Sequence, residues 1–346
     1  MIKKKILISA LEPSANLHLK KVLDELNEYE PKGIFSPKFG KPFMSSDEFS
    51  AMGFVEVLPL IFKAKRAIKK MVELAKECEH ILLIDSPAFN LPLAKALKEA
   101  NVKAPITYYI LPQVWAWKQK RVEKVEKYCD NLASILPFDE EYYNRSVYVG
   151  HPLLDIINET KTDYSNNRVL SFLPGSRRAE ISKLMPIFNE LIKNYKDYKK
   201  QLVVPPHLKD KIAQFYGDVS EYEILFDTKE ALLKSEFAFV CSGTATLEAT
   251  LVGTPFVLCY KAKNIDMFIA KLFVKNIKHA GLANIIFTFW GKKPLHKELL
   301  QDDVNVQNLL KAHRDCDYKE FANSAKELRQ YLKFGSAKNV ANLIKA

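Results

Sequence analysis

The sequence predicts an α/β protein made of two parallel-sheet domains in tandem. Its 346 residues exceed the size of about 250 to 300 residues at which a single hydrophobic core stops growing. Short apolar runs alternate with segments whose apolar residues recur at helical spacing, which is the pattern of βαβ units. The alternation occurs twice, before and after the polar stretch 158–167, which lacks apolar periodicity and is interpreted as a linker.

The expected elements follow from this alternation. In the first half the apolar runs predict strands at residues 5–10, 81–85, 106–111 and 132–136. In the second half they predict strands at 168–173, 201–204, 222–226, 237–241 and 255–260, and after Pro294 the pattern is wholly helical. These elements give an N-terminal domain at 1–160 and a C-terminal domain at 165–335. Gly335 marks a helix end, and Ser336 is expected to cap a last helix, 336–346, that packs back on the first domain.

Composition favours a globular protein with a polyanionic partner. Hydrophobic residues make up 48% of the chain, and the 52 Lys and Arg against 41 Asp and Glu give a net charge of +11. Such a balance suits nucleic acid, phosphorylated small molecules or an anionic membrane. Five scattered cysteines without a CxxC pair indicate neither a disulfide framework nor a zinc site, which fits a reducing compartment. The first apolar run is too short for a signal peptide, and no stretch reaches the roughly 20 residues of a membrane span.

Residues directly after strands are the first candidates for a ligand site, because open parallel sheets bind ligands beyond the carboxyl ends of their strands. Residues 9–16 pass from a strand into a helix, where either simple capping or anion binding explains the polar side chains. Asp85 ends another strand, and Pro87 turns the chain away from the sheet. Asp85 is therefore expected to project into the crevice, either as a general base or as the acceptor of an Asx-turn.

A third strand end carries two tryptophans and several cations. Trp115 and Trp117 precede Lys118, and tryptophans two residues apart do not share a helix face, so a loop or a helix entry is expected. Aromatic rings beside cations suit a sugar, a base or a lipid surface. The alternative places one tryptophan in the core and the other on the surface.

In the second half, residues 173–180 predict an anion site. A Pro-Gly turn is followed by Ser176 as expected N-cap and by Arg177 and Arg178 in the first helical turn. Arginine is unfavourable at the positive end of a helix, so these residues point to a fixed anion. A charge pair with Glu180 is the competing explanation.

Residues 241–248 offer a second anion-binding turn. Ser242, Gly243 and Thr244 are small enough to let backbone N–H groups approach a phosphate closely. Glu248 falls one turn into the following helix, where a carboxylate can accept from ribose hydroxyls or serve a structural role. Neither a Walker loop nor a GxGxxG fingerprint accompanies these turns.

Three further patterns carry less information. The histidines form no metal-ligand pair, so no metal is expected. The acidic residues around Cys316 are interpreted as a solvated helix start. Residues 264–279 have basic, amphipathic helical spacing, which fits a membrane-surface helix and an ordinary surface helix equally well.

Taken in order, these motifs resemble the lipid-A-disaccharide synthase family. The resemblance is carried by IDSPAFNLPLAKAL, LPQVWAWKQKRV, LPFDEEYY, GHPLLD, LPGSRRAEI, SGTATLEATLVGTP and GLANII, and it runs from residue 9 to about 287. It implies a GT-B fold, in which two Rossmann-like domains face an interdomain cleft, with the acceptor bound by the N-terminal domain and the UDP-sugar by the C-terminal one. The implied reaction is inverting transfer from UDP-2,3-diacylglucosamine to 2,3-diacylglucosamine 1-phosphate, which forms a β-1,6 disaccharide and UDP without metal or cofactor.

The resemblance also assigns roles. The family's catalytic aspartate maps onto Asp85, its PGSR arginine onto Arg177, and its L[PA]N asparagine onto Asn284. With the strand-end residues, the expected UDP and phosphate site comprises Ser176, Arg177, Ser242, Gly243, Thr244, Glu248 and Asn284. The acceptor-side candidates are Glu12, Ser14, Asn90, Trp115, Trp117 and Lys118.

The chain departs from the family pattern in two places. LEPSAN replaces the usual GE[PT]SGD, so a carboxylate role at Asn16 is lost, and IDSPAFN replaces IDAPDFN, so Ala88 removes a second acid beside Asp85. The expected partners are the two lipid-sugars and an anionic membrane, on the cytoplasmic face of the bacterial inner membrane, with no nucleic acid. The resemblance also favours a homodimer. The alternatives are another GT-B UDP-sugar enzyme, such as a murein-precursor GlcNAc transferase or a UDP-sugar epimerase, or a non-catalytic basic binder.

Overall fold

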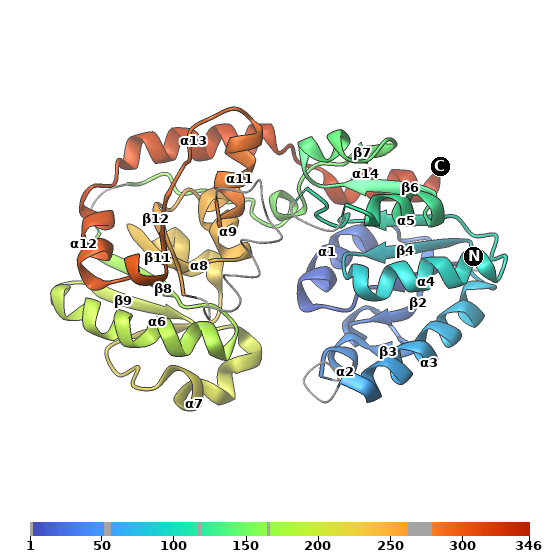
Figure 1. The fold of residues 1–346 in the computed structure, drawn as a ribbon, viewed down its shortest axis with the longest axis horizontal. Coiled ribbons are helices and arrows are strands. Elements are labelled where there is room, and N and C mark those ends of the chain that lie inside the picture. Colours follow the sequence, from blue (N-terminus) through green and yellow to red (C-terminus); the bar gives the residue numbers. More distant parts are fainter. Residues whose placement is uncertain (1–2, 52–56, 116–118, 165–166, 262–278) are drawn as a thin grey trace. The chain divides into compact units, whose positions relative to one another are not determined.

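The computed structural model describes residues 3–51, 57–115, 119–164, 167–261 and 279–346 (Figure 1). The chain divides into two compact units, each built on its own parallel sheet. The N-terminal unit comprises Met1–Ile156 and Leu332–Ala346, and the C-terminal unit comprises Ile157–Tyr331. The chain thus leaves the first unit after Ile156 and returns to it for the last helix.

The sheet of the N-terminal unit has seven parallel strands in the order β3-β2-β1-β4-β5-β6-β7. Its strands are β1 (Lys4–Ser9), β2 (Tyr29–Phe35), β3 (Met44–Ser45), β4 (His80–Ile84), β5 (Ile106–Tyr109), β6 (Asn131–Ser134) and β7 (Ser146–Tyr148). Its helices are α1 (Pro13–Asp24), α2 (Ser46–Ala51), α3 (Val57–Ala75), α4 (Pro87–Glu99), α5 (Arg121–Tyr128) and α14 (Ser336–Lys345). The order reverses between β1 and β4, which is the topological switch point of this sheet.

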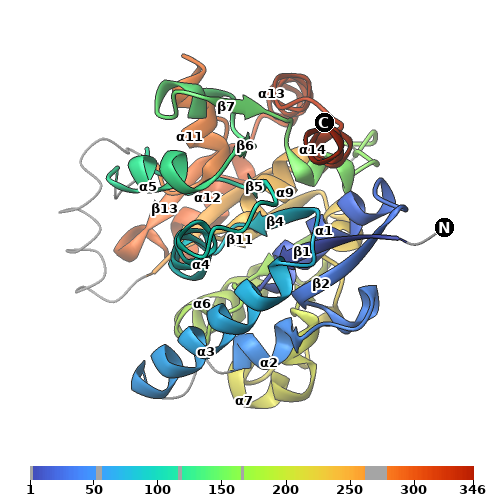
Figure 2. The same cartoon turned by 90° about the vertical axis from the view of Figure 1, so that its right-hand side faces the viewer.

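Alternation along the strands gives this sheet two apolar faces. Ile6 and Ile8 of β1 pack with α1 and α14 on one face, while Leu7 packs with α3 and α4 on the other. Figure 2 shows these helices on the two sides of the sheet. Both faces are covered, as a parallel sheet requires.

The sheet of the C-terminal unit has six parallel strands in the order β10-β9-β8-β11-β12-β13, and its switch point lies between β8 and β11. The strands are β8 (Val169–Leu173), β9 (Lys199–Val203), β10 (Glu223–Leu225), β11 (Phe237–Cys241), β12 (Phe256–Tyr260) and β13 (Lys297–Leu300). The helices are α6 (Arg178–Leu191), α7 (Ile212–Tyr216), α8 (Thr228–Lys234), α9 (Thr244–Val252), α11 (Leu282–Phe289), α12 (Val306–Arg314) and α13 (Tyr318–Tyr331).

Two expectations about the C-terminal region are corrected by the structure. The segment after Pro294 is not wholly helical, because β13 forms there and pairs with β12 at the sheet edge. A strand this short shows little periodicity in the sequence. Ser336 does not cap the last helix. Gly335 is the N-cap residue, and the Asp155 carboxylate accepts from the backbone N–H groups of Gly335 and Ala337, at 2.8 and 2.7 Å.

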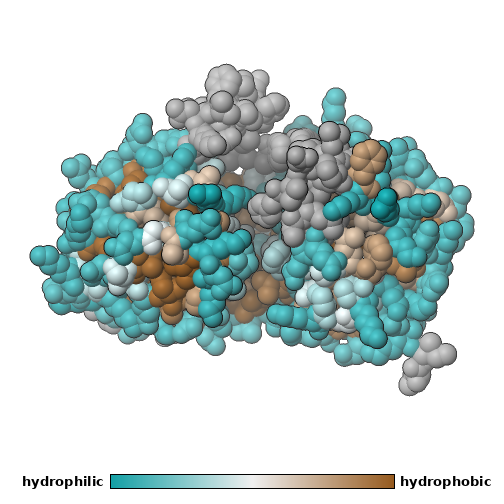
Figure 3. Space-filling view, turned by 90° about the horizontal axis from the view of Figure 1, so that it is seen from below, coloured by the Kyte–Doolittle hydropathy of each residue, from teal (hydrophilic) through white to brown (hydrophobic). Residues whose placement is uncertain are grey.

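Two surface features are ordinary for a globular chain. Asp317 accepts from two backbone N–H groups in the first turn of α13, at 3.0 and 2.9 Å, so the acidic stretch around Cys316 is a helix start, as predicted. The face seen in Figure 3 is mostly hydrophilic, with smaller hydrophobic areas between. Within the described ranges, no helix is long and apolar enough to cross a membrane.

The N-terminal unit should lose stability in mild acid, because two neighbouring histidines are packed without charge. Burial lowers the pKa of His18 to about 4 and that of His151 to about 3. In the unfolded chain histidine titrates near a pKa of about 6.5. As the pH falls below that value, the unfolded chain binds protons that the folded chain excludes. The unfolding free energy then drops by roughly 1.4 kcal/mol for each pKa unit of difference.

The measurement is the thermal midpoint at neutral pH and at about pH 5, between the folded and unfolded pKa values. His151→Asn should reduce the acid-induced loss, since the asparagine oxygen can replace Nδ1 as acceptor of the Leu153 N–H. The exposed His207 offers a matched control, and His207→Asn should lose as much as the unaltered chain. An equal loss in both variants would contradict the explanation.

Candidate active site

Asp85 lies immediately after β4, at the switch point of the N-terminal sheet. Asp85 and Ser86 both have left-handed backbone conformations, with φ of 50° and 44°. Such residues cost roughly 1–3 kcal/mol each and persist where the surrounding structure holds them. The two together turn the chain sharply from β4 into α4.

Three side chains hold this strained turn. The Asn90 amide donates to the carbonyl oxygens of Ile84 and Asp85, at 3.1 and 2.7 Å. The Ser9 hydroxyl, at the end of β1, donates to Asn90 Oδ1 at 2.6 Å. The Tyr108 hydroxyl, from β5, donates to the Asp85 carbonyl oxygen at 2.6 Å. The backbone of Asp85 is thus fixed from both neighbouring strands.

These bonds change the expected role of Asn90. Its side chain is fully buried beneath the turn and is bonded to the protein through both its oxygen and its nitrogen. Asn90 is therefore placed to position Asp85, and not to contact an acceptor as we expected. Sequence alone does not separate these two roles.

The Asp85 carboxyl is half-buried, and its pKa is raised above the ordinary aspartate value. Burial is the main cause and the nearby Glu12 carboxylate adds to it, while a hydrogen bond from the Ser86 N–H acts in the opposite direction. A carboxylate with a raised pKa binds a proton more readily. The group therefore suits general base chemistry.

The other acceptor-side candidates fall into different environments. Glu12 is exposed as the N-cap residue of α1, and Ser14 is exposed in its first turn. Trp115 is buried and packs edge-to-face on Phe138, with ring centroids 5.7 Å apart. Its expected contact with an acceptor is therefore corrected to the alternative, a core role. Trp117 and Lys118 lie outside the described residues, as does most of the predicted amphipathic helix at 264–279.

Asn16, which departs from the family pattern, is structural. Its amide donates to the carbonyl oxygens of Ala10 and Glu12, at 3.0 and 2.9 Å, and its oxygen accepts from the Ser36 N–H at 2.7 Å. Asn16 thereby holds the turn between β1 and α1. An asparagine can do this because, unlike a carboxylate, it both donates and accepts hydrogen bonds.

In the C-terminal unit, a cavity of about 340 Å³ lies at the switch point between β8 and β11. Its lining includes Gly175, Ser176 and Arg177 of the β8–α6 turn and Ser242, Gly243 and Thr244 of the β11–α9 turn. The structure thus brings together all the residues expected to bind UDP except Glu248 and Asn284. Helices α6 and α9 both begin at this cavity, and two helix N-termini suit an anion.

The β8–α6 turn depends on a glycine. Gly175 has a φ of +99°, and a Cβ there would lie 2.6 Å from Glu180 Oε2. The positive φ favours glycine at this position, and a side chain there would also displace the Glu180 carboxylate. Helix α6 begins at Arg178, so Arg177 is the N-cap residue, which corrects the expectation for Ser176.

Arg177 forms the charge pair that was the competing explanation for its position. The guanidinium lies 2.9 Å from Glu180 Oε1, and the Arg177 side chain is nevertheless 80% exposed. The pair engages one terminal nitrogen of a guanidinium that has several N–H donors. The ion pair is therefore compatible with an anion bound at the same place.

Glu248 is a half-buried acid one turn into α9. Burial raises its pKa to about 7, and the Asp227 carboxylate contributes in the same direction. Asp227 follows β10 and caps α8, where it accepts from the Glu230 N–H at 2.9 Å. Glu248 does not line the cavity, and its contact with ribose stays a prediction.

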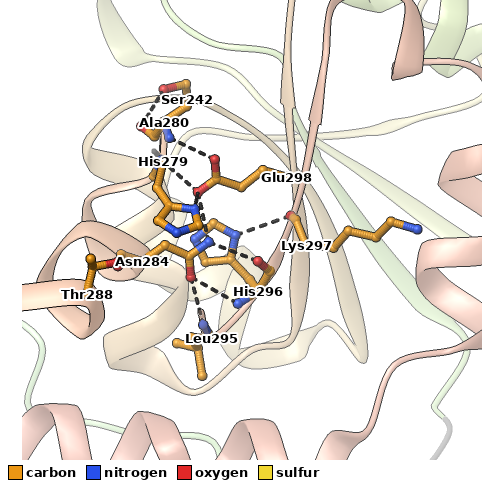
Figure 4. A network of polar contacts seen from close by, with 10 residues as sticks. Ser242, His279, Ala280, Asn284, Thr288, Leu295, His296, Lys297 and Glu298 are labelled. Carbon is orange, nitrogen blue, oxygen red and sulfur yellow. Dashed lines mark hydrogen bonds and ion pairs between the residues drawn. The ribbon is translucent and has the colours of Figure 1, made fainter. Parts of the chain in front are cut away.

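Asn284 is fully buried in the network shown in Figure 4. Its Nδ2 donates to the His296 carbonyl oxygen at 2.9 Å and to Glu298 Oε1 at 2.8 Å. Its Oδ1 accepts from the backbone N–H groups of Leu295 and His296, at 2.7 and 3.1 Å. An amide has two donor hydrogens and two acceptor lone pairs, so the protein engages all of them. Direct contact with UDP is therefore corrected to a positioning role.

Sequence reasoning missed Glu298, because the strand that carries it was unexpected. The available signal is a glutamate beside two leucines in the short run 297–300. Its carboxylate bonds both Asn284 and the loop that precedes α11. Among the described residues, no group of His, Cys, Asp or Glu side chains is placed to hold a metal ion.

The raised pKa of Glu248 should lower the stability of the folded chain as the pH rises to neutrality. Because its folded pKa of about 7 lies above the ordinary glutamate value, the folded chain retains a proton that the unfolded chain releases. Stability is therefore lost as the pH rises from about 4.5 through 7, by roughly 1.4 kcal/mol per pKa unit. Glu248→Gln removes this loss, so its thermal midpoint should exceed that of the unaltered chain at pH values above 7. Glu190→Gln, at an exposed site on α6, should show no such gain.

Comparison with known proteins identifies the family. The sequence model described as lipid-A-disaccharide synthetase matches residues 6–342. The lipid-A-disaccharide synthase of Campylobacter jejuni is 54% identical over 363 residues, which cover 99% of each chain. That of Helicobacter pylori is 45% identical over 352 residues, which cover 97% of each chain.

Solved structures agree on the fold at low identity. A putative UDP-N-acetylglucosamine 2-epimerase from Listeria monocytogenes has a TM-score of 0.62 at 16% identity, over 100% of this chain and 96% of that one. CalG4, the calicheamicin glycosyltransferase, has a TM-score of 0.59 at 12% identity, over 100% and 98%. The two parallel-sheet units thus have the GT-B fold of glycosyltransferases and epimerases, and by sequence the chain belongs to the lipid-A-disaccharide synthase family.

Proposed function

We propose that this chain transfers a 2,3-diacylglucosamine unit from UDP to 2,3-diacylglucosamine 1-phosphate. The anomeric centre inverts, and the products are the β-1,6-linked disaccharide 1-phosphate and UDP. Family membership over nearly the whole chain supports these substrates. The observation that carries the mechanism is Asp85, held in a strained turn at the switch point with a raised pKa.

In the proposed reaction Asp85 is the general base. Its carboxylate takes the proton of the acceptor 6-hydroxyl as that oxygen attacks the donor anomeric carbon in line. Attack on the face opposite the diphosphate inverts the centre without a covalent intermediate. Because Ala88 stands where the family has a second acid, the base in this turn is Asp85 alone.

The electron pair of the broken glycosidic bond goes to the diphosphate of UDP. The N-termini of α6 and α9, with the Arg177 guanidinium, place positive charge around the cavity where we locate that group. The backbone N–H groups of Gly243 and Thr244 would donate to the phosphate oxygens. Glu248 would accept from the ribose hydroxyls.

Both substrates carry acyl chains, and we place the enzyme at the cytoplasmic face of the inner membrane. On α3, the Phe62 side chain is 69% exposed. Five exposed cations follow it on the same helix, Lys63, Lys65, Arg66, Lys69 and Lys70. An exposed aromatic ring beside cations suits contact with anionic lipid.

The proposed activity is tested by mixing the protein with both lipid-sugars in detergent and following the lipids by mass spectrometry. A disaccharide monophosphate together with UDP is the expected result. No product despite measurable UDP binding would contradict the acceptor. An epimerised UDP-sugar would instead place the chain with the epimerases of its fold.

Asp85→Asn should lower the transfer rate by about 10²–10⁴-fold, the usual contribution of a general base. Binding of UDP and the thermal midpoint should change little, because the amide preserves the shape of the side chain. Asp24→Asn, at an exposed aspartate of α1, is the matched control and should keep the full rate. A rate close to normal in Asp85→Asn would overturn the assignment.

The membrane proposal predicts a charge-dependent affinity. Replacing Lys63, Lys65 and Lys69 by Gln should weaken cosedimentation with phosphatidylglycerol vesicles by about 100-fold, at about 1 kcal/mol for each lysine near the surface. The same loss of charge at the exposed Lys319, Lys326 and Lys338 is the control. Equal weakening by both triple variants would show that net charge matters and α3 does not.

A further inference from the structure

Glu298 lies on β13 and holds the loop 279–281 by hydrogen bonds. Its Oε2 accepts from the Ala280 N–H at 2.7 Å, and its Oε1 accepts from the Gly281 N–H at 3.1 Å (Figure 4). The Asn284 amide donates to the same Oε1 at 2.8 Å, and His279 Nδ1 lies 3.7 Å from it. The Glu298 side chain is 9% exposed. A buried carboxylate with these partners fixes the backbone of the loop.

The loop in turn contacts the anion cavity. The Ser242 hydroxyl donates to the Ala280 carbonyl oxygen at 3.2 Å. Ser242 lines the cavity in the turn between β11 and α9. A continuous path of hydrogen bonds therefore joins Glu298, through Ala280, to the turn where the proposed diphosphate binds.

The His296 ring also restricts the position of the loop 279–281. A Cβ at Gly281 would lie 2.6 Å from two atoms of the His296 imidazole, although the φ of Gly281 is ordinary. His296 is buried, and its ring centroid lies 4.4 Å from that of the tilted Phe256 ring, so it has little room to move. The loop is thus held between the Glu298 carboxylate and the His296 ring.

We propose that Glu298 is a positioning residue of the donor site, which sets the place of Ser242 and the β11–α9 turn through the loop 279–281. Asn284 acts with it by orienting the carboxylate. The inference rests on the proposed function, because it assumes that the cavity takes the UDP diphosphate. In this role Glu298 affects UDP binding without touching UDP or the sugar.

Glu298→Gln tests this directly. The glutamine has the same shape, but its NH₂ group must face either the Ala280 N–H or the N–H groups of Gly281 and Asn284. Two hydrogen-bond donors then face each other, and we expect the loop to shift to separate them. Glu298→Asp keeps the charge at a shorter reach, so it should restore part of the function.

The measurements are calorimetric binding of UDP, the KM of each substrate, and the thermal midpoint. Glu298→Gln should weaken UDP binding and raise the donor KM by at least about tenfold, with the acceptor KM unchanged, since one misplaced hydrogen-bond set is worth roughly that factor. The UDP affinity and the donor KM of Glu298→Asp should lie between those of the unaltered chain and those of Glu298→Gln. Glu190→Gln is the matched control and should bind UDP normally.

A double-mutant cycle with Ser242→Ala examines the path. If Glu298 acts through Ala280 and Ser242, adding Glu298→Gln to Ser242→Ala should weaken UDP binding less than it does alone. Additive effects, or normal UDP binding by folded Glu298→Gln, would overturn the inference. If Glu298→Gln does not fold, the cycle is run with Glu298→Asp.

Failure of the proposed function gives a different result. An unaltered chain that does not bind UDP would contradict the donor site itself, whatever the variants do. An unaltered chain that binds UDP, with all Glu298 variants equal to it, contradicts the positioning role alone.

Discussion

Backbone groups at the carboxyl ends of the strands no longer have partners in the sheet, and the candidate site depends on how they are satisfied. Buried N–H and C=O groups must be bonded. In the N-terminal unit two buried asparagines do this: Asn90 bonds the turn after β4, and Asn16 bonds the turn after β1. In the C-terminal unit Asn284 has the same kind of role at the amino end of a strand, where it bonds the segment before β13. Each amide both donates and accepts, so one side chain fixes two stretches of chain at once. The exposed functional groups are rigid because the buried amides beside them are fully bonded.

The candidate sites of the two units have different electrostatic properties. In the N-terminal unit, burial and the Glu12 carboxylate raise the pKa of Asp85 and favour proton uptake. In the C-terminal unit, Arg177 and two helix N-termini favour negative charge. A reaction that removes a proton from one substrate and builds charge on the leaving group of the other needs both conditions. Each unit provides one of them without having to provide the other.

The sequence predicted most of the sheet cores and the strand ends, because hydrophobic periodicity and turn residues are local signals. Asp85 and the two anion-binding turns were found in this way. Four strands were missed, namely β2, β3, β7 and β13. A proline and a glycine interrupt the apolar pattern of β2, and the other three strands have only two to four residues and little periodicity. Glu298 was missed together with β13. Asn90 and Trp115 were assigned to the acceptor because a side chain near a strand end looks the same in sequence whether it points outward or into the protein. Asn284 was assigned to UDP by the family resemblance, which does not tell contact with a ligand from a positioning role. Only the tertiary hydrogen bonds and burial separate these cases.

The return of the chain to its first unit has a consequence for synthesis. Helix α14 packs against α1, and Val340, Ala341 and Ile344 are buried in the core beneath it. Domains generally fold from the N-terminus as they emerge from the ribosome. Here the unit that emerges first lacks part of its core until α14 has also emerged. Until then, the surface of α1 that α14 covers in the folded unit is in contact with water.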